Sequence, residues 1–116
     1  MVLEEKAKLF KALSDPNRLR ILGMLQGKKL CVCEITAVLD LAASTVSEHL
    51  RVLESAGFII GEKDGKWMNY AINLSSSDPT VVSILSMFPF WISTDKTVTA
   101  DADKAVIVEG NKLCCR

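Results

Sequence analysis

The sequence predicts a mainly helical α+β fold with about five helices and one two-stranded β-hairpin. Apolar residues recur at helical spacing before residue 57, the pattern alternates over 58–73, and an Asp64-Gly65 pair divides that alternating stretch. The chain has 116 residues, of which 49% are hydrophobic and 24% charged, as expected of a single globular domain.

Four helices are expected before the hairpin, each with a recognisable end. Asp15 suits the cap of the second helix, and Pro16 suits its first position because the missing N–H has no partner there. Gly27 is a suitable C-terminal stop for that helix. The expected ranges are 3–13, 17–26, a third helix ending near 39, and 44–56.

The alternating stretch predicts a hairpin with Asp64 and Gly65 as its two-residue turn. That turn would pair Lys63 with Lys66, and one face would carry Ile59, Met68, Tyr70 and Ile72.

A fifth helix over about 80–88 is expected after the capping segment 75–79. We therefore divide the chain into a main domain over 1–92 and a C-terminal tail over 93–116. The tail is expected to hold at most a short helix before the vicinal cysteines.

Helices followed by a hairpin in this order form a winged helix-turn-helix, in which one helix enters the DNA major groove and the wing reaches the backbone. Within 44–56, Val46, Leu50 and Leu53 form an apolar stripe, and the opposite side is polar. A polar face is also common on any surface helix, and the segment 45–48 fits a capping box. The candidate DNA contacts are Ser44, Thr45, Ser47, Glu48, His49 and Arg51 on the helix, with Lys63 and Lys66 on the hairpin.

The formal net charge is zero, so an anion-binding surface must come from local placement of charge. The longest apolar stretch, 81–92, is too short for a membrane helix and contains a proline. The acidic start of the chain is unlike a signal peptide. We therefore expect a cytoplasmic protein with no membrane partner.

The cysteines form two pairs, Cys31 with Cys33 and Cys114 with Cys115, and neither pair has C-x-x-C spacing. Soft thiolates select trivalent arsenic or antimony, zinc, cadmium and copper(I). On a regular helix, residues 31 and 33 would point about 200° apart, so they can share an ion only where the backbone is extended or unwound. The alternative is that they are buried thiols that pack as small apolar side chains.

Four blocks of sequence carry a resemblance to a known family: Phe10–Leu22, Leu30–Glu34, Ser44–Leu53 and Gly65–Tyr70. Over roughly residues 5–75 the chain resembles the ArsR-type (ArsR/SmtB) arsenic- and metal-responsive transcriptional repressors. The resemblance implies a homodimeric winged-helix repressor, paired through its first helix and a C-terminal helix, that leaves its operator DNA when an inducer binds. It also implies that the polar face of 44–51 reads the operator.

By the same resemblance, the block Leu30–Glu34 looks like an arsenite-sensing site at the start of the helix before the reading helix. The family pattern has a third cysteine three positions after the second, and this chain has Thr36 there. Cys114 or Cys115 could supply the missing ligand, could form a separate site, or could have no role. The expected inducer is As(III) or Sb(III), and the alternatives are Zn or Cd, or oxidation of the thiols.

Two other classes of function are alternatives to a DNA-binding repressor. A thiol enzyme, such as an arsenate reductase or a disulfide exchanger, is disfavoured because the chain lacks a phosphate-binding glycine loop and C-x-x-C, and its single histidine lies in the DNA-reading block. A protein-interaction module would fail to bind any promoter fragment. We expect no enzymatic activity.

Overall fold

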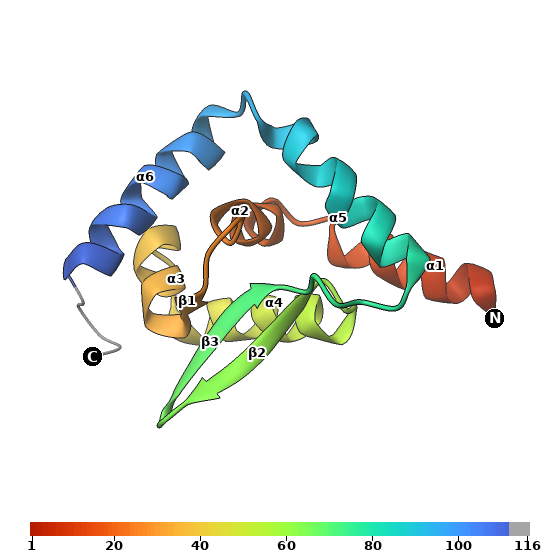
Figure 1. Cartoon of the computed structure of the whole chain (residues 1–116), viewed down its shortest axis with the longest axis horizontal. Coiled ribbons are helices and arrows are strands. Elements are labelled where there is room, and N and C mark those ends of the chain that lie inside the picture. Colours follow the sequence, from red (N-terminus) through yellow and green to blue (C-terminus); the bar gives the residue numbers. More distant parts are fainter. Residues whose placement is uncertain (112–116) are drawn as a thin grey trace.

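The computed structural model describes residues 1–111, drawn in colour in Figure 1. Its three strands form one antiparallel sheet in the order β1-β3-β2. In chain order the elements are α1 (Val2–Ala12), α2 (Pro16–Met24), β1 (Leu30–Cys31), α3 (Val32–Leu39), α4 (Ala43–Ser55), β2 (Ile59–Asp64), β3 (Trp67–Ile72), α5 (Pro79–Ile92) and α6 (Lys96–Asn111). The predicted α+β winged helix-turn-helix is confirmed, with β1 added to the two strands of the hairpin.

Helix α2 lies at the centre of the molecule, and the other elements surround it (Figure 1). Helices α5 and α6 slope away from the turn that joins them above α2, α3 lies beside α6, and α4 runs beneath with the hairpin. The core includes Ile21, Leu22 and Leu25 of α2, Ile35 and Val38 of α3, the predicted stripe Val46, Leu50 and Leu53 of α4, and Phe58, Ile59, Val81, Ile84 and Phe88.

Helix starts follow the predicted caps in two places and differ in one. The Asp15 carboxylate accepts from the N–H of Asn17 at 2.8 Å, and Asp78 accepts from the N–H of Thr80 at 2.9 Å. The capping box expected over 45–48 is wrong, because α4 begins at Ala43 and its N-cap residue, Ala42, makes no side-chain cap. Glu48 bonds to Arg51 on the next turn of the helix instead.

The predicted pairing of Lys63 with Lys66 is also wrong. Lys63 lies opposite Met68 and Asp64 opposite Trp67, so the turn residues are Gly65 and Lys66. Gly65 has φ +62°, and among the non-glycine residues described only Asp40 has a positive φ. A positive φ at the first turn position alone is typical of a type II′ turn, which places glycine there. The pairing shifts by two residues, so the predicted shared face of Ile59, Met68, Tyr70 and Ile72 is confirmed.

The C-terminal part is more helical than its polarity indicated. Helix α5 passes through Pro89 to Ile92, beyond the expected end at Phe88. The extra turn places the Trp91 ring edge-on to Phe88, with 6.2 Å between ring centroids. Helix α6 then packs on α2 and α3. No helix within residues 1–111 combines the length and apolar character needed to cross a bilayer.

Candidate DNA-binding face and thiol site

The polar side of α4 forms one exposed face. Ser44, Ser47, Glu48 and Arg51 are exposed and follow helical spacing, so they lie on the same side of the helix, opposite the buried stripe. Thr45 is exposed beside them. The structure therefore brings together five of the six predicted helix contacts.

Arg51 and Glu48 form a two-point ion pair on this face. Arg51 Nε donates to Glu48 Oε2 at 2.9 Å, and Arg51 Nη2 donates to Glu48 Oε1 at 2.5 Å. The hydrogen bond from Arg51 lowers the pKa of the Glu48 carboxyl, and the carboxylate raises the pKa of the Arg51 guanidinium. Both side chains remain well exposed, so water screens the pair and a nearby phosphate can compete for the guanidinium.

His49, the sixth predicted helix contact, is partly buried and lies against Arg18 of α2. Its Nδ1 lies 3.3 Å from Nη1 of Arg18. Arg18 also donates through Nε to the carbonyl of Ala12 at 2.6 Å and through Nη2 to that of Lys11 at 3.2 Å. Arg18 therefore links the end of α1 to the DNA-reading helix. The sequence pattern did not indicate this role, because two of the three partners are backbone carbonyls.

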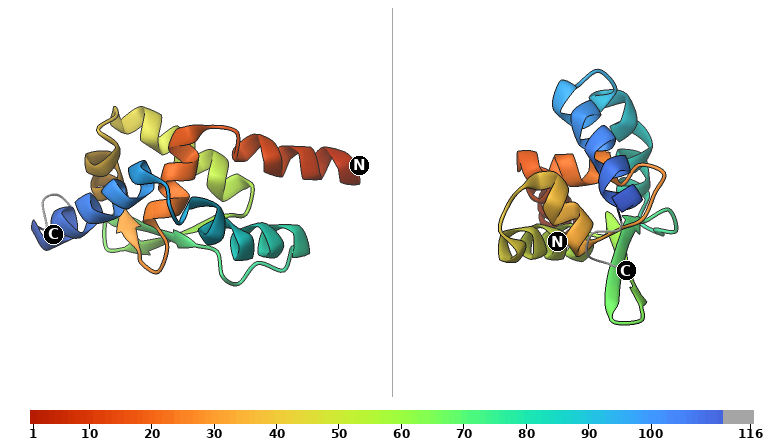
Figure 2. Two further views of the ribbon diagram at one scale, coloured as in Figure 1. Left: turned by 90° about the horizontal axis from the view of Figure 1, so that it is seen from above. Right: turned by 90° about the vertical axis from the view of Figure 1, so that its left-hand side faces the viewer.

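The predicted hairpin lysines lie at the tip of the wing, which projects from the body of the molecule (Figures 1 and 2). Lys63 is near the end of β2 and Lys66 is in the turn, and both are exposed. The Nζ of Lys66 lies 5.6 Å from the centroid of the Trp67 ring, a cation–π distance. The aromatic ring thus holds one cation at the tip.

The thiol site lies where β1 turns into α3. Cys31 is buried and extended, with φ −85° and ψ 167°, whereas Cys33 is in the first turn of α3, partly exposed and outside any disulfide. The condition derived from the sequence is met, because the two cysteines do not share a regular helix. The buried carboxylate of Glu34 accepts from the N–H of Cys31 at 2.9 Å and closes the helix start.

Strand β1 joins this thiol segment to the wing. Leu30 lies opposite Tyr70, and Cys31 lies opposite Asn69 on β3. The same segment leads directly into α3, which packs on α4. The segment that holds the cysteines is therefore connected to both the wing and α4.

The donor set of the described residues is soft but incomplete for a three-sulfur ion. Thr36, at the position of the family's third cysteine, has a buried Oγ1 without a hydrogen-bond partner. Within residues 1–111, no three His, Cys, Asp or Glu side chains gather as a metal site. Cys114 and Cys115 lie outside the described residues. Of the four cysteines in the sequence, the described residues therefore bring Cys31 and Cys33 to this junction.

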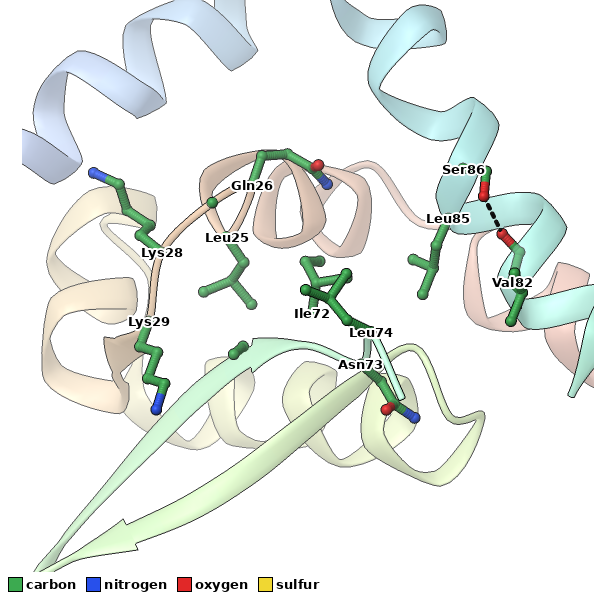
Figure 3. A pocket seen from close by; sticks show the side chains of 12 residues that line it. Leu25, Gln26, Lys28, Lys29, Ile72, Asn73, Leu74, Val82, Leu85 and Ser86 are labelled. Carbon is green, nitrogen blue, oxygen red and sulfur yellow. Dashed lines mark hydrogen bonds between the residues drawn. The ribbon is translucent and has the colours of Figure 1, made fainter. Parts of the chain in front are cut away.

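A cavity of about 480 Å³ lies away from both sites, between the end of α2, β3 and α5 (Figure 3). Its walls are largely apolar, and Lys28 and Lys29 lie at one side. Lys28 pairs with Glu109 at 2.8 Å, and Lys29 pairs with Glu62 at 2.7 Å. None of the candidate DNA contacts, and neither Cys31 nor Cys33, lines this cavity.

Comparison with known proteins identifies the family. Residues 15–60 match the profile of bacterial regulatory proteins of the arsR family. An uncharacterised HTH-type transcriptional regulator of Methanocaldococcus jannaschii, MJ1325, is 41% identical over 70 residues, which is 60% of this chain and 79% of that protein. The arsenical resistance operon repressor of Bacillus subtilis is 38% identical over 73 residues, 62% of this chain and 70% of that protein.

Two further relatives extend the comparison. The cadmium resistance regulator CadC of Listeria innocua is 42% identical over 64 residues, covering 54% of each protein, so the match spans about half of that relative. The crystal structure of the transcriptional repressor PagR of Bacillus anthracis superposes with a TM-score of 0.58 at 33% identity, over 75% of this chain and 95% of that one. The chain belongs to the arsR family of bacterial regulatory proteins, which are winged helix-turn-helix transcriptional regulators that bind DNA.

Proposed function

We propose that this protein is a homodimeric repressor that binds operator DNA through α4 and the wing, and that releases the DNA when a thiophilic ion binds Cys31 and Cys33. The position of the two cysteines carries the proposal. They lie at the junction of β1 and α3, which is paired to the wing on one side and packed toward α4 on the other.

The DNA-binding face suits readout in the major groove. Ser44, Thr45 and Ser47 are short hydroxyl side chains near the N-terminus of α4, where the helix dipole also favours phosphate. Arg51 can reach phosphate or guanine when it exchanges Glu48 for DNA. Lys63 and Lys66 at the wing tip would bind flanking phosphates.

The dimer is proposed from the exposed apolar surface of α1 and α5. Phe90 is 75% exposed and Trp91 58% exposed on α5, and Phe10 is 61% exposed on α1. Lys6 of α1 donates to the hydroxyl of Thr80 at 2.5 Å, so the two helices are joined at one point. Large aromatic side chains at a protein surface are typical of an interface core.

As(III) or Sb(III) is the inducer we propose first, because the B. subtilis relative is named for arsenical resistance and trivalent arsenic prefers thiolates. Cys31 and Cys33 would supply two sulfurs, and Cys114 or Cys115 the third. Cadmium or zinc is the second candidate, since the CadC relative is named for cadmium resistance. Either ion would supply strong bonds to sulfur, and the resulting loss of DNA affinity would come from the change in the protein's own conformation.

Release requires that the inducer bind the DNA-incompetent dimer more tightly than the competent one. A shift from mostly bound to mostly free needs about 5.5 kcal/mol of differential affinity. Bringing the two sulfurs together would strain the bond between Glu34 and the Cys31 N–H and the pairing of Cys31 with Asn69. Ion binding also displaces thiol protons, so induction should weaken as the pH falls.

The central experiment measures binding to the protein's own upstream DNA by fluorescence anisotropy, under reducing conditions, while arsenite, cadmium and zinc are titrated. Wild type should release the DNA. Cys33→Ser should bind the DNA as wild type does and need at least about tenfold more ion for release, because one of two sulfurs is gone. If wild type retains the DNA with every ion, and serine at 31 and 33 changes nothing, the proposed sensor is wrong.

Thr36→Cys tests the ligand count directly. A third thiol at this position should lower the arsenite concentration needed for release and should remove any dependence on the tail cysteines. Thr97→Cys is the matched control, because it adds a thiol at an exposed position of α6. If Cys114→Ser with Cys115→Ser leaves wild-type arsenite affinity unchanged, the tail supplies no ligand.

A further inference from the structure

A basic cleft lies between α1 and α4, beside the proposed DNA-binding face. Its volume is about 410 Å³. Its eight lining residues include four cations and no carboxylate, although the whole chain has no net charge. The lining residues are Lys8, Lys11 and Ala12 of α1, Arg18 of α2, and Arg51, Val52, Ser55 and Ala56 of α4 and its end.

The cations of this basic cleft are held in different ways. Arg18 is fixed by its bonds to two carbonyls of α1 and by His49, so its charge is anchored against the protein. Lys8 and Lys11 lie one turn apart on the same side of α1. Both lysines are exposed, and neither forms an ion pair within the described part of the chain. Besides Arg51, the cleft therefore combines one anchored cation with two exposed lysines that form no ion pair within the described residues.

The balance of charge here favours an anion. At the edge of the cleft, Glu48 neutralises the charge of Arg51. No carboxylate lines the cleft to neutralise Lys8, Lys11 and Arg18. A concave surface lined by one sign of charge concentrates the opposite ion. Arg51 joins the cleft to the proposed DNA-binding face, because it lines the cleft and also lies on the polar face of α4. DNA is therefore the anion that would lie closest to the cleft. DNA bound along α4 would place its backbone at this opening.

We infer that the basic cleft binds backbone phosphates of the DNA that α4 reads, so that α1 is a DNA-contacting helix as well as part of the apolar surface. The inference rests on the proposed DNA binding and adds contacts outside the helix and wing. In helix-turn-helix proteins an element next to the reading helix commonly crosses the DNA backbone. Such contacts fix register and supply affinity that does not depend on base sequence.

The test is the salt dependence of DNA affinity for the double variant Lys8→Gln with Lys11→Gln. Each lost phosphate contact should reduce the slope of log affinity against log salt by about 0.9, so the double variant should lose about 2 per chain. Affinity should fall by a similar factor on the upstream DNA and on unrelated DNA. Lys96→Gln is the control, because Lys96 is exposed at the start of α6, at the opposite side of the molecule from α4 (Figure 1).

The possible outcomes separate this inference from the proposed function. If wild type binds no DNA, the proposed function fails. If wild type binds and the folded double variant keeps the wild-type slope, the inference is overturned. Inorganic phosphate added at constant ionic strength should compete with DNA more in wild type than in the double variant, because both anions would use the same cations. Equal competition in the two proteins would overturn the inference.

Discussion

Helices α5 and α6 follow each other in the chain and lean on opposite sides of α2, but they are held differently (Figures 1 and 2). Three long-range polar links tie α6 to the body: Arg20 with Asp101, Lys28 with Glu109, and Lys104 with the carbonyl of Val38. Helix α5 buries one apolar side and exposes another that carries Met87, Phe90 and Trp91. Helix α6 is therefore bonded to the rest of the subunit, whereas α5 leaves an apolar surface exposed, as expected of the proposed dimer interface.

The largest effect is expected from a charge on the exposed side of α5. Trp91→Lys should raise the dimer dissociation constant by at least about a hundredfold, because the substitution occurs twice in a two-fold interface. Sedimentation equilibrium measures the change. Ile107→Lys on α6, where the side chain is 62% exposed, is the control. If this control dissociates the dimer and Trp91→Lys does not, the two helices have the opposite roles.

Asp101→Asn should show how firmly α6 is held. Both carboxylate oxygens accept from Arg20, at 2.9 and 3.0 Å, and Asp101 is only 4% exposed. Removing one partner of such a pair should lower the free energy of unfolding by about 3 kcal/mol. Urea denaturation measures the loss, with Asp103→Asn as the control at an exposed position of the same helix. Equal stability of the two variants would mean that α6 is not held by this pair.

Gly23→Leu tests the close approach of α6 to α2. A Cβ at Gly23 would lie 3.1 Å from Cγ1 of Val98 and 3.4 Å from Cδ1 of Ile92. A leucine should therefore cost about 2 kcal/mol of stability through overpacking. The same substitution in a Val98→Ala background should cost less, because the smaller side chain makes room. A cost that does not depend on residue 98 would contradict the proposed contact.

The smallest effect is expected at the exposed pair of Lys29 and Glu62, which contrasts with the buried pair of α6. The hydrogen bond and charge of Lys29 lower the pKa of Glu62. A lowered folded-state pKa means that the contribution is present above the ordinary carboxyl pKa and is lost as the pH falls through the folded value. The small stability difference between wild type and Lys29→Met should therefore be present at neutral pH and should shrink as the pH falls below the ordinary carboxyl pKa. A difference that grows on acidification would contradict this pairing.

Local signals were sufficient to predict most of the helices and the wing. Asp15-Pro16 and Asp78-Pro79 begin α2 and α5, and the buried side of α4 follows the expected spacing. The extent of α6 was not predicted, because its inward stripe of Val98, Asp101, Ala105 and Val108 contains an aspartate. Asp101 can be buried there because Arg20, which is far away in the sequence, donates hydrogen bonds to its carboxylate.

The candidate site was predictable to a similar degree. Residue types and spacing were enough to identify the polar face of α4 and the cysteines, because these depend on local order along the chain. The pairing of Cys31 with Asn69 and the bonds of Arg18 to α1 depend on backbone atoms far apart in sequence. Side-chain patterns do not report such contacts, so the path from the thiols to the wing and the basic cleft required the structure.

The two-residue strand β1 has a consequence for how such a regulator can change over time. Its ladder with β3 uses main-chain atoms, which every amino acid except proline supplies in full. A protein that exchanged the cysteines for ligands of another chemistry would keep the mechanical connection to the wing. Inducer choice and operator choice can thus diversify separately on one inherited backbone.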